Sequence, residues 1–107
     1  MSELVQKLSQ GQHKLEVSLR PHSTPAALRD SIGKGYVHLR FTETRGGTDL
    51  YVPLLSDQSD VASGDFDHGR GTVKLVGRLT LDYVPVRCIA SIDLQTMKGT
   101  GHLEPLA

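Results

Sequence analysis

The sequence has few of the residues that mark specialised classes of protein. Cys88 is its single cysteine, so the chain cannot form an internal disulfide, and a zinc site made of several cysteines is excluded. Twelve lysines and arginines balance twelve aspartates and glutamates, which gives a formal net charge of +0. Without a global positive field the chain has no electrostatic hold on a polyanion, and we therefore expect no nucleic-acid partner.

Long hydrophobic runs are missing as well. No segment approaches the roughly 20 apolar residues that a membrane span needs, and the first ten residues lack the apolar core of a signal peptide. We therefore expect a cytoplasmic protein with no membrane partner, a location that agrees with the single cysteine. Because 107 residues is close to the commonest domain size, residues 1–107 are predicted to form a single domain.

An alternation of apolar and polar side chains is the main positive signal, and it is clearest over residues 72–83. The odd, apolar positions are Val73, Leu75, Leu79, Leu81 and Tyr83. Because successive side chains of a strand point to opposite faces, this pattern predicts a strand with one buried and one solvated face. Together with the other alternating segments, it predicts a mainly β fold: an antiparallel sandwich or partly open barrel of about six strands, with one or two short helices.

Two segments are predicted to be helical. Residues 2–10 carry apolar side chains on one side and end at Gly11, a residue that readily adopts a left-handed conformation. Residues 25–32 follow a capping Thr24, begin with a proline and stop at Gly33. We expect the second helix to pack over one opening or face of the sheet.

Three hairpins are predicted, with turns at residues 45–46, around 84–85 and near 98–99. For the second turn, which has no glycine or asparagine, we prefer a four-residue loop to a cis peptide bond before the proline. In the first hairpin the expected register places Phe41 opposite Leu50. A slip by one residue would turn one strand's apolar side chains toward water, so the faces of each strand are well determined.

The outer face of the first hairpin is one candidate binding surface. It groups Tyr36, His38 and Arg40 on one strand and Tyr51, expected beside Arg40, on the next. Two aromatics, a histidine and an arginine on one sheet face suit an anionic or flat ligand, or a partner protein. The alternatives are that the tyrosines are ordinary strand formers, that Arg40 stacks on Tyr51, or that a helix covers this face.

Residues 55–71 form a second candidate, because polar connections of this length are usually functional or disordered. Its binding candidates are Asp65, Asp67, His68 and Arg70. The spacing does not match a calcium loop, and one histidine among scattered carboxylates is a poor zinc set, so we predict no metal. We expect a mobile segment that becomes ordered on binding, with Phe66 able to anchor it to the core.

No catalytic constellation is present. Cys88 falls at an inward strand position, where a thiol is inert, and the five histidines are scattered. We therefore predict a non-catalytic binding or accessory β domain without a cofactor, which engages a protein partner or a small-molecule ligand through the outer sheet face and the 55–71 loop. The alternative is a small metal-dependent or acid/base enzyme that uses Asp65, Asp67 and His68.

A homodimer is a further expectation. Pro53 cannot donate a backbone hydrogen bond, so residues 50–53 are expected to form an edge strand. An edge strand can pair with a copy of itself, and the proline would limit that pairing to part of the strand.

Overall fold

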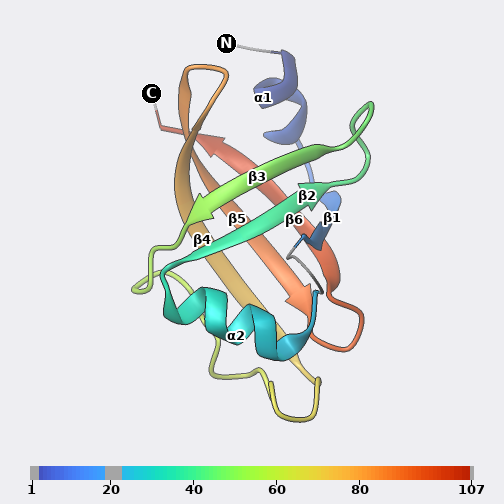
Figure 1. Cartoon of the computed structure of the whole chain (residues 1–107). Coiled ribbons are helices and arrows are strands. Elements are labelled where there is room, and N and C mark those ends of the chain that lie inside the picture. The colour runs from blue at the N-terminus through green and yellow to red at the C-terminus, as the bar shows by residue number, and fades with distance from the viewer. Residues whose placement is uncertain (1–2, 19–22, 107) are drawn as a thin grey trace.

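The computed structural model describes residues 3–18 and 23–106. In this part of the chain, six antiparallel strands form one sheet in the order β3-β2-β1-β6-β5-β4, accompanied by two short helices (Figure 1). The mainly β prediction is confirmed, in the form of a nearly closed barrel. The helices are α1 (Glu3–Leu8) and α2 (Pro25–Gly33), and the strands are β1 (His13–Val17), β2 (Tyr36–Phe41), β3 (Thr48–Pro53), β4 (Thr72–Leu81), β5 (Val84–Asp93) and β6 (Lys98–Pro105).

The barrel is brought together where the edge strands β3 and β4 meet. Leu54 forms an antiparallel bridge with Gly77, and the backbone N–H of Leu55 donates to the carbonyl oxygen of Val76 at 2.8 Å. A Cβ atom at residue 77 would lie 2.4 Å from the carbonyl oxygen of Pro53. Only glycine allows so close an approach of two backbones, so Gly77 permits this closure.

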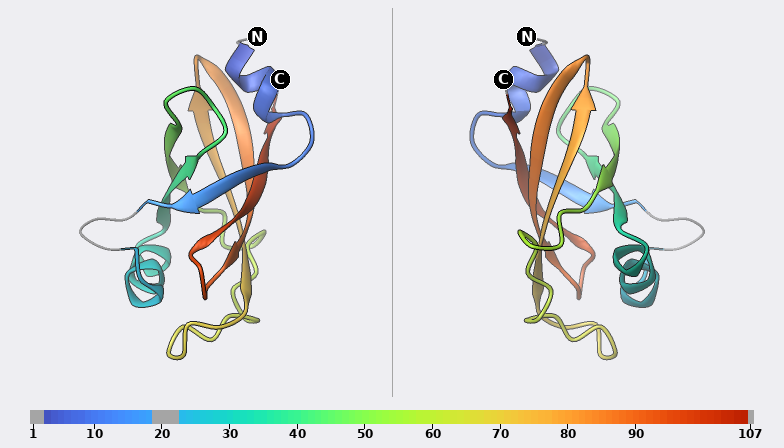
Figure 2. Two further views of the ribbon diagram at one scale, coloured as in Figure 1. Left: turned by 90° about the vertical axis from the view of Figure 1, so that its right-hand side faces the viewer. Right: turned by 90° about the vertical axis from the view of Figure 1, so that its left-hand side faces the viewer.

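The core lies inside the barrel and is closed by a helix at each end (Figure 2). Alternate residues of the strands point inward, as the sequence pattern predicts. Val5 and Leu8 of α1 are fully buried at one end, and Leu28 of α2 is fully buried at the other. The prediction that the second helix packs over an opening is confirmed. In the described part of the chain, no helix is long and apolar enough to span a membrane.

The local signals at the ends of α2 are also confirmed, whereas α1 ends at Leu8, before the predicted residue 10. The Thr24 hydroxyl accepts a hydrogen bond from the backbone N–H of Ala27 at 3.1 Å, and α2 ends at Gly33. The Ser31 hydroxyl donates to the carbonyl oxygen of Tyr36, which connects α2 to the start of β2. Gly11 adopts a left-handed φ of 74° after α1. The first residue of the predicted 2–10 helix lies outside the described residues.

All three predicted registers are wrong and the second and third turns are misplaced, although the strand faces are right and residues 45–46 do lie in the connection between β2 and β3. Phe41 lies opposite Thr48 instead of Leu50. In the second hairpin Leu81 pairs with Val84, and the third hairpin turns at residues 94–97. Each register differs from the prediction by an even number of residues. An even shift leaves every side chain on the same face, so the apolar pattern could not reveal it.

The second turn explains why Tyr83 does not point inward as predicted. Asp82 and Tyr83 have φ values of 49° and 66°, as the two central residues of a type I′ turn require. Glycine and asparagine are the usual residues there, so the rule we applied did not identify this pair. Tyr83 was expected to point inward, but it is 100% exposed at the tip of the hairpin.

Candidate functional site

Three aromatic rings meet on the outer face of β2 and β3. Tyr36 and His38 alternate along β2, and His38 lies directly opposite Tyr51 of β3. The ring centroids are 5.2 Å apart for Tyr36 and Tyr51, 5.3 Å for His38 and Tyr51, and 5.6 Å for Tyr36 and His38. Such distances are typical of interacting aromatic pairs. We call Tyr36, His38 and Tyr51 the outer aromatic patch.

The outer aromatic patch is open to solvent. Tyr51 is 55% exposed, His38 is exposed, and Tyr36 is half-buried. Helix α2 contacts the start of β2, but it leaves these rings uncovered, so the alternative of a helix-covered face is wrong. Rigid rings that are already packed against one another can accept a flat group without losing much conformational freedom.

Arg40 lies on the same face, but its partner differs from the prediction. It lies opposite Asp49, while Tyr51 lies opposite His38. The guanidinium donates to Asp49 at 3.0 Å and to the carbonyl oxygen of Gly46 at 2.9 Å. Arg40 therefore holds the β2–β3 turn, and an anionic ligand would have to compete with Asp49 for it.

The four candidates in the 55–71 segment do not act as one group, because they have different partners. The Nδ1 atom of His68 lies 2.7 Å from the Asp65 carboxylate, and the hydrogen bond from His68 lowers the pKa of Asp65 below its ordinary value of 3.8. Asp67 instead accepts a hydrogen bond from Arg29 of α2 at 2.9 Å. Arg70 joins Asp65 only through two backbone hydrogen bonds, of 2.8 and 3.0 Å. Among the described residues, no group of three or more His, Cys, Asp or Glu could hold a metal ion.

The 55–71 segment has more backbone attachments than its polar composition suggests. Asp60 and Lys74 exchange two backbone hydrogen bonds of 2.8 Å, and the N–H of Leu94 donates to the carbonyl oxygen of Gly71 at 2.9 Å. Phe66 packs against the core, as predicted. In the described part of the chain, no hydrogen bond, ion pair or ring contact connects residues 65–70 with the outer aromatic patch. The mobility of this segment remains a prediction.

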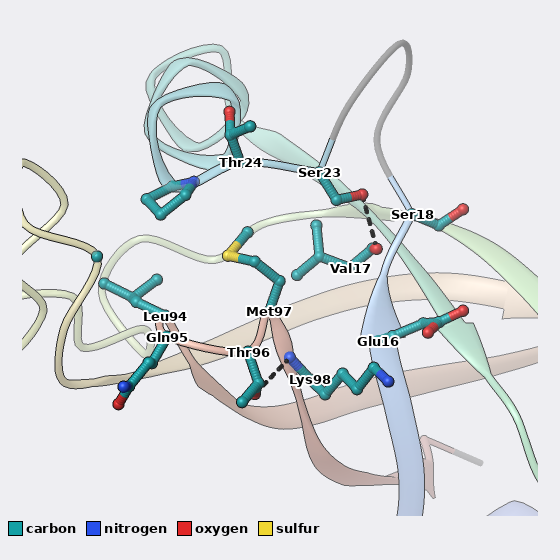
Figure 3. Close-up of a pocket in the computed structure, with 12 residues that line it drawn as sticks. Glu16, Val17, Ser18, Ser23, Thr24, Leu94, Gln95, Thr96, Met97 and Lys98 are labelled. Carbon is teal, nitrogen blue, oxygen red and sulfur yellow. Dashed lines mark hydrogen bonds between the residues drawn. The ribbon is translucent and has the colours of Figure 1, made fainter.

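A cavity that sequence reasoning missed lies at the N-terminal end of α2 (Figure 3). Its volume of about 660 Å³ is in the range of small-molecule sites. We call it the α2 cavity. Its walls come from the end of β1, the start of α2, the β5–β6 turn and one glycine of the 55–71 segment: Glu16, Val17, Ser18, Ser23, Thr24, Pro25, Gly69, Leu94, Gln95, Thr96, Met97 and Lys98.

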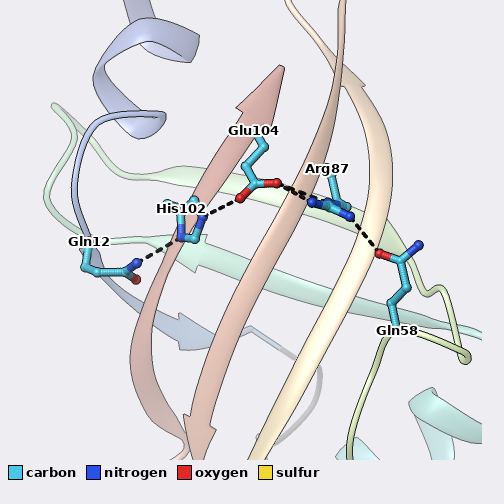
Figure 4. Close-up of polar contacts among 5 residues, drawn as sticks. All are labelled: Gln12, Gln58, Arg87, His102 and Glu104. Atoms are coloured by element: carbon cyan, nitrogen blue, oxygen red, sulfur yellow. Dashed lines mark hydrogen bonds and ion pairs between the residues drawn. The ribbon is translucent and has the colours of Figure 1, made fainter. Parts of the chain in front are cut away.

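A polar network that sequence reasoning also missed crosses the outer face of β5 and β6 (Figure 4). Gln12 contacts His102 at 3.0 Å, and His102 contacts Glu104 at 3.1 Å. Arg87 donates to Glu104 and, at 2.9 Å, to Gln58 of the 55–71 segment. Its hydrogen bonds, ahead of those from His102, lower the pKa of Glu104. The one local signal was the spacing of His102 and Glu104, which puts both on one strand face.

Comparisons with known proteins add no function. No protein-family model matches the chain, and no curated protein matches its sequence. The interpretation of the site therefore rests on the geometry of its own residues.

Proposed function

We propose that this chain is a non-catalytic binding or accessory β domain. It engages a protein partner or a small ligand through the outer aromatic patch, with the 55–71 segment as a second contact surface. The observation that carries the proposal is the contact of three rings at 5.2–5.6 Å on a solvated sheet face, where Tyr51 is 55% exposed. Exposed tyrosines in a rigid setting are common centres of binding energy.

Binding is favoured over catalysis by the state of the reactive groups. Burial raises the pKa of Cys88 to about 12, and the side chain is 1% exposed, so a nucleophilic thiolate is not available. The acid/base alternative requires Asp65, Asp67 and His68 to act together, but Asp67 is paired with Arg29. What remains is a single exposed Asp65–His68 pair, without a buried cleft to strengthen it.

The chemistry of the patch limits the class of ligand. The rings offer flat faces, and the tyrosine hydroxyls and the imidazole offer polar atoms, which suits a planar or aromatic group. A net charge of +0 favours such a group over a nucleic acid. We also propose a cytoplasmic location, since a sole, buried cysteine is stable in a reducing compartment.

A second copy of the chain is one candidate for the protein partner. The backbone N–H of Leu54 donates to Gly35, just before β2, and that of Leu55 donates to Val76 of β4. Because the backbone groups of successive residues point to opposite sides of a strand, the odd-numbered residues of β3 direct theirs away from β2. Asp49 and Tyr51 would therefore present an edge to a partner strand, and Pro53 would end it. Sedimentation at several micromolar concentrations tests this: a monomeric mass that is independent of dilution would contradict the dimer.

Site-specific crosslinking tests the protein-partner form of the proposal. A photoreactive phenylalanine analogue is placed at residue 51 and, as a matched control, at residue 83, since Tyr83 is also an exposed tyrosine but lies outside the patch. We expect a discrete crosslinked partner from residue 51 and none from residue 83. Identical products from both positions would contradict the proposal.

Native mass spectrometry tests the small-ligand form. The protein is purified from its natural source without denaturation, as the wild type and as the variants Tyr51→Ser and Tyr83→Ser. We expect an accompanying mass that is lost in Tyr51→Ser and retained in Tyr83→Ser. If neither experiment gives a signal that depends on residue 51, the outer aromatic patch is not a binding surface.

A further inference from the structure

An apolar spot lies on the outer face of β4 and β5. Val76 points away from the core, because its neighbour Leu75 points into it, and Val76 and Ile89 are partners in the strand register. Val76 is 2% exposed and Ile89 is half-buried, but neither belongs to the cluster of side chains that fills the barrel. A cavity of about 520 Å³ opens over this pair, and we call it the β4–β6 cavity. Apolar surface of this kind, outside the core and among polar side chains, is typical of a binding site.

The rim of the β4–β6 cavity is polar and belongs to the same face of the sheet. Lys74 lies two residues before Val76 on β4. Arg87 lies two residues before Ile89 on β5. Because the two strands are antiparallel, Lys74 and Arg87 lie on opposite sides of the apolar pair. The other polar residues of the rim belong with Arg87 to the network in Figure 4: Gln58, His102 and Glu104.

Positive charge is in surplus at this place. Arg78 of β4 lies directly opposite Arg87 of β5, and like charges in such a pair destabilise a sheet. The Glu104 carboxylate pairs with Arg87. Arg78 and Lys74 form no ion pair with any residue that the structure describes. The surplus is local, because the whole chain has a formal net charge of +0.

Arg87 is held in a fixed orientation at the rim. Its Nε and Nη2 atoms donate to Glu104, and its Nη1 atom donates to Gln58 at 2.9 Å. A guanidinium has five N–H donors, so these three hydrogen bonds leave two donors for a ligand. Because the side chain is already ordered, binding to it costs little conformational entropy.

We propose that the β4–β6 cavity binds a small organic anion with an apolar body. The body of the ligand packs on Val76 and Ile89. Its anionic group lies between the two cations that flank this pair, and it accepts hydrogen bonds from the free donors of Arg87 and from the Lys74 ammonium. The added negative charge also relieves the repulsion between Arg87 and Arg78. This site lies on other strands than the outer aromatic patch, so its test does not depend on the function proposed above.

Three probes test the ligand class: hexanoate, acetate, which lacks the apolar body, and hexylamine, which has the opposite charge. Each is titrated at constant ionic strength into the ¹⁵N-labelled full chain. We expect saturable shifts with hexanoate at the amides of residues 58, 74–76, 87–89 and 102–104. Hexanoate should bind about tenfold more tightly than acetate, which corresponds to the burial of about two methylene groups. Hexylamine should give no saturable shift at these residues. No saturable shift with hexanoate, or equal affinity for hexanoate and either of the other probes, would overturn the proposal.

Two variants test the cation and the apolar floor separately. Lys74→Met should weaken hexanoate binding about threefold, because the lysine is an exposed charge. Lys14→Met is the matched control, since Lys14 is also an exposed lysine within a strand but does not line the cavity, and it should leave the affinity unchanged. Ile89→Thr keeps a β-branched side chain and should weaken hexanoate about threefold without changing the affinity for acetate. Circular dichroism confirms that each variant is folded. An unchanged affinity for hexanoate in folded Lys74→Met or in folded Ile89→Thr would overturn the assignment.

Discussion

Replacing Gly99 by alanine should strongly destabilise the barrel. Gly99 lies in β6 between Leu15 of β1 and Ile92 of β5. A Cβ atom at residue 99 would lie 1.7 Å from the carbonyl oxygen of Ser91, 2.8 Å from its carbonyl carbon and 3.1 Å from the Cα atom of Ile92. All three are backbone atoms, so no rotation of a side chain can relieve the overlap.

The size of the effect follows from these distances. Ordinary contact begins at 3.4 Å, so the distance from the new Cβ atom to the Ser91 oxygen would have to double. Such a shift would separate β5 from β6 and break about two ladder hydrogen bonds, each worth about 1 kcal/mol. With overpacking of about 1–3 kcal/mol, Gly99→Ala should lower the free energy of unfolding by about 3–5 kcal/mol.

Urea unfolding followed by far-UV circular dichroism measures this change, which suits a chain without tryptophan. Gly33→Ala is the matched control, because nothing lies within 4 Å of a Cβ atom at that position in α2. The control should raise the free energy of unfolding by about 0.5 kcal/mol, since alanine favours the helix. Equal stability of the two variants would refute the close approach of β5 and β6.

Three further predictions concern single side chains, and a fourth concerns metal ions. Cys88 should react with a bulky thiol reagent only after unfolding, because burial raises its pKa to about 12; fast labelling of the native protein would contradict its position. Tyr83→Gly should raise the free energy of unfolding in urea by about 1 kcal/mol, because Tyr83 has a left-handed φ and no buried surface to lose; lower stability would argue against the turn. Arg87 and His102 lower the pKa of Glu104 in the folded state, so the ionised carboxylate stabilises the fold above its ordinary pKa of 4.5. This stabilisation is lost as the pH falls through the lowered pKa of the folded state. Glu104→Gln should therefore make the free energy of unfolding depend less on pH in the acid range, and an unchanged dependence would contradict this. Calcium or zinc should leave the melting temperature unchanged, because Asp67 is paired with Arg29; a rise that Asp65→Asn with Asp67→Asn removes would favour the enzyme alternative.

The class of fold could be predicted because a strand's face depends only on whether a residue is odd or even. The inward positions of Val37 and Leu39 follow from alternation alone, and both are buried. Strand partners could not be predicted in this way. They depend on where each turn lies, and a shift by two residues, such as that of Phe41 from Leu50 to Thr48, has no cost in the apolar pattern.

For the candidate site, too, the sequence predicted which side chains share a face, but not which of them are neighbours. Alternation put Tyr36, His38 and Tyr51 on one outer face, and they are in contact there. The predicted neighbour of Tyr51 was Arg40, and the register error of the first hairpin accounts for that mistake. The functional role of the patch remains a prediction.

Contacts between distant segments could not be predicted at all. Asp67 was grouped with its neighbours in sequence, but its partner Arg29 comes from a helix that precedes it by several elements. Arg87 and Gln58 are likewise brought together only by the path of the 55–71 segment. No local pattern contains this information, because it depends on how the whole barrel closes.

The third turn was misplaced because of the use that this chain makes of glycine. We expected glycine to mark turns, and Gly99 was assigned to one. In the structure Gly99 and Gly77 lie within strands, where neighbouring backbones approach too closely for any side chain. The tight turns instead carry Tyr83 and Met97 in left-handed conformations. Both residues therefore adopt a conformation that costs free energy. Met97 offsets this cost with a side chain that is buried in the core, whereas Tyr83 is fully exposed and offsets nothing, which is why Tyr83→Gly is expected to stabilise the protein.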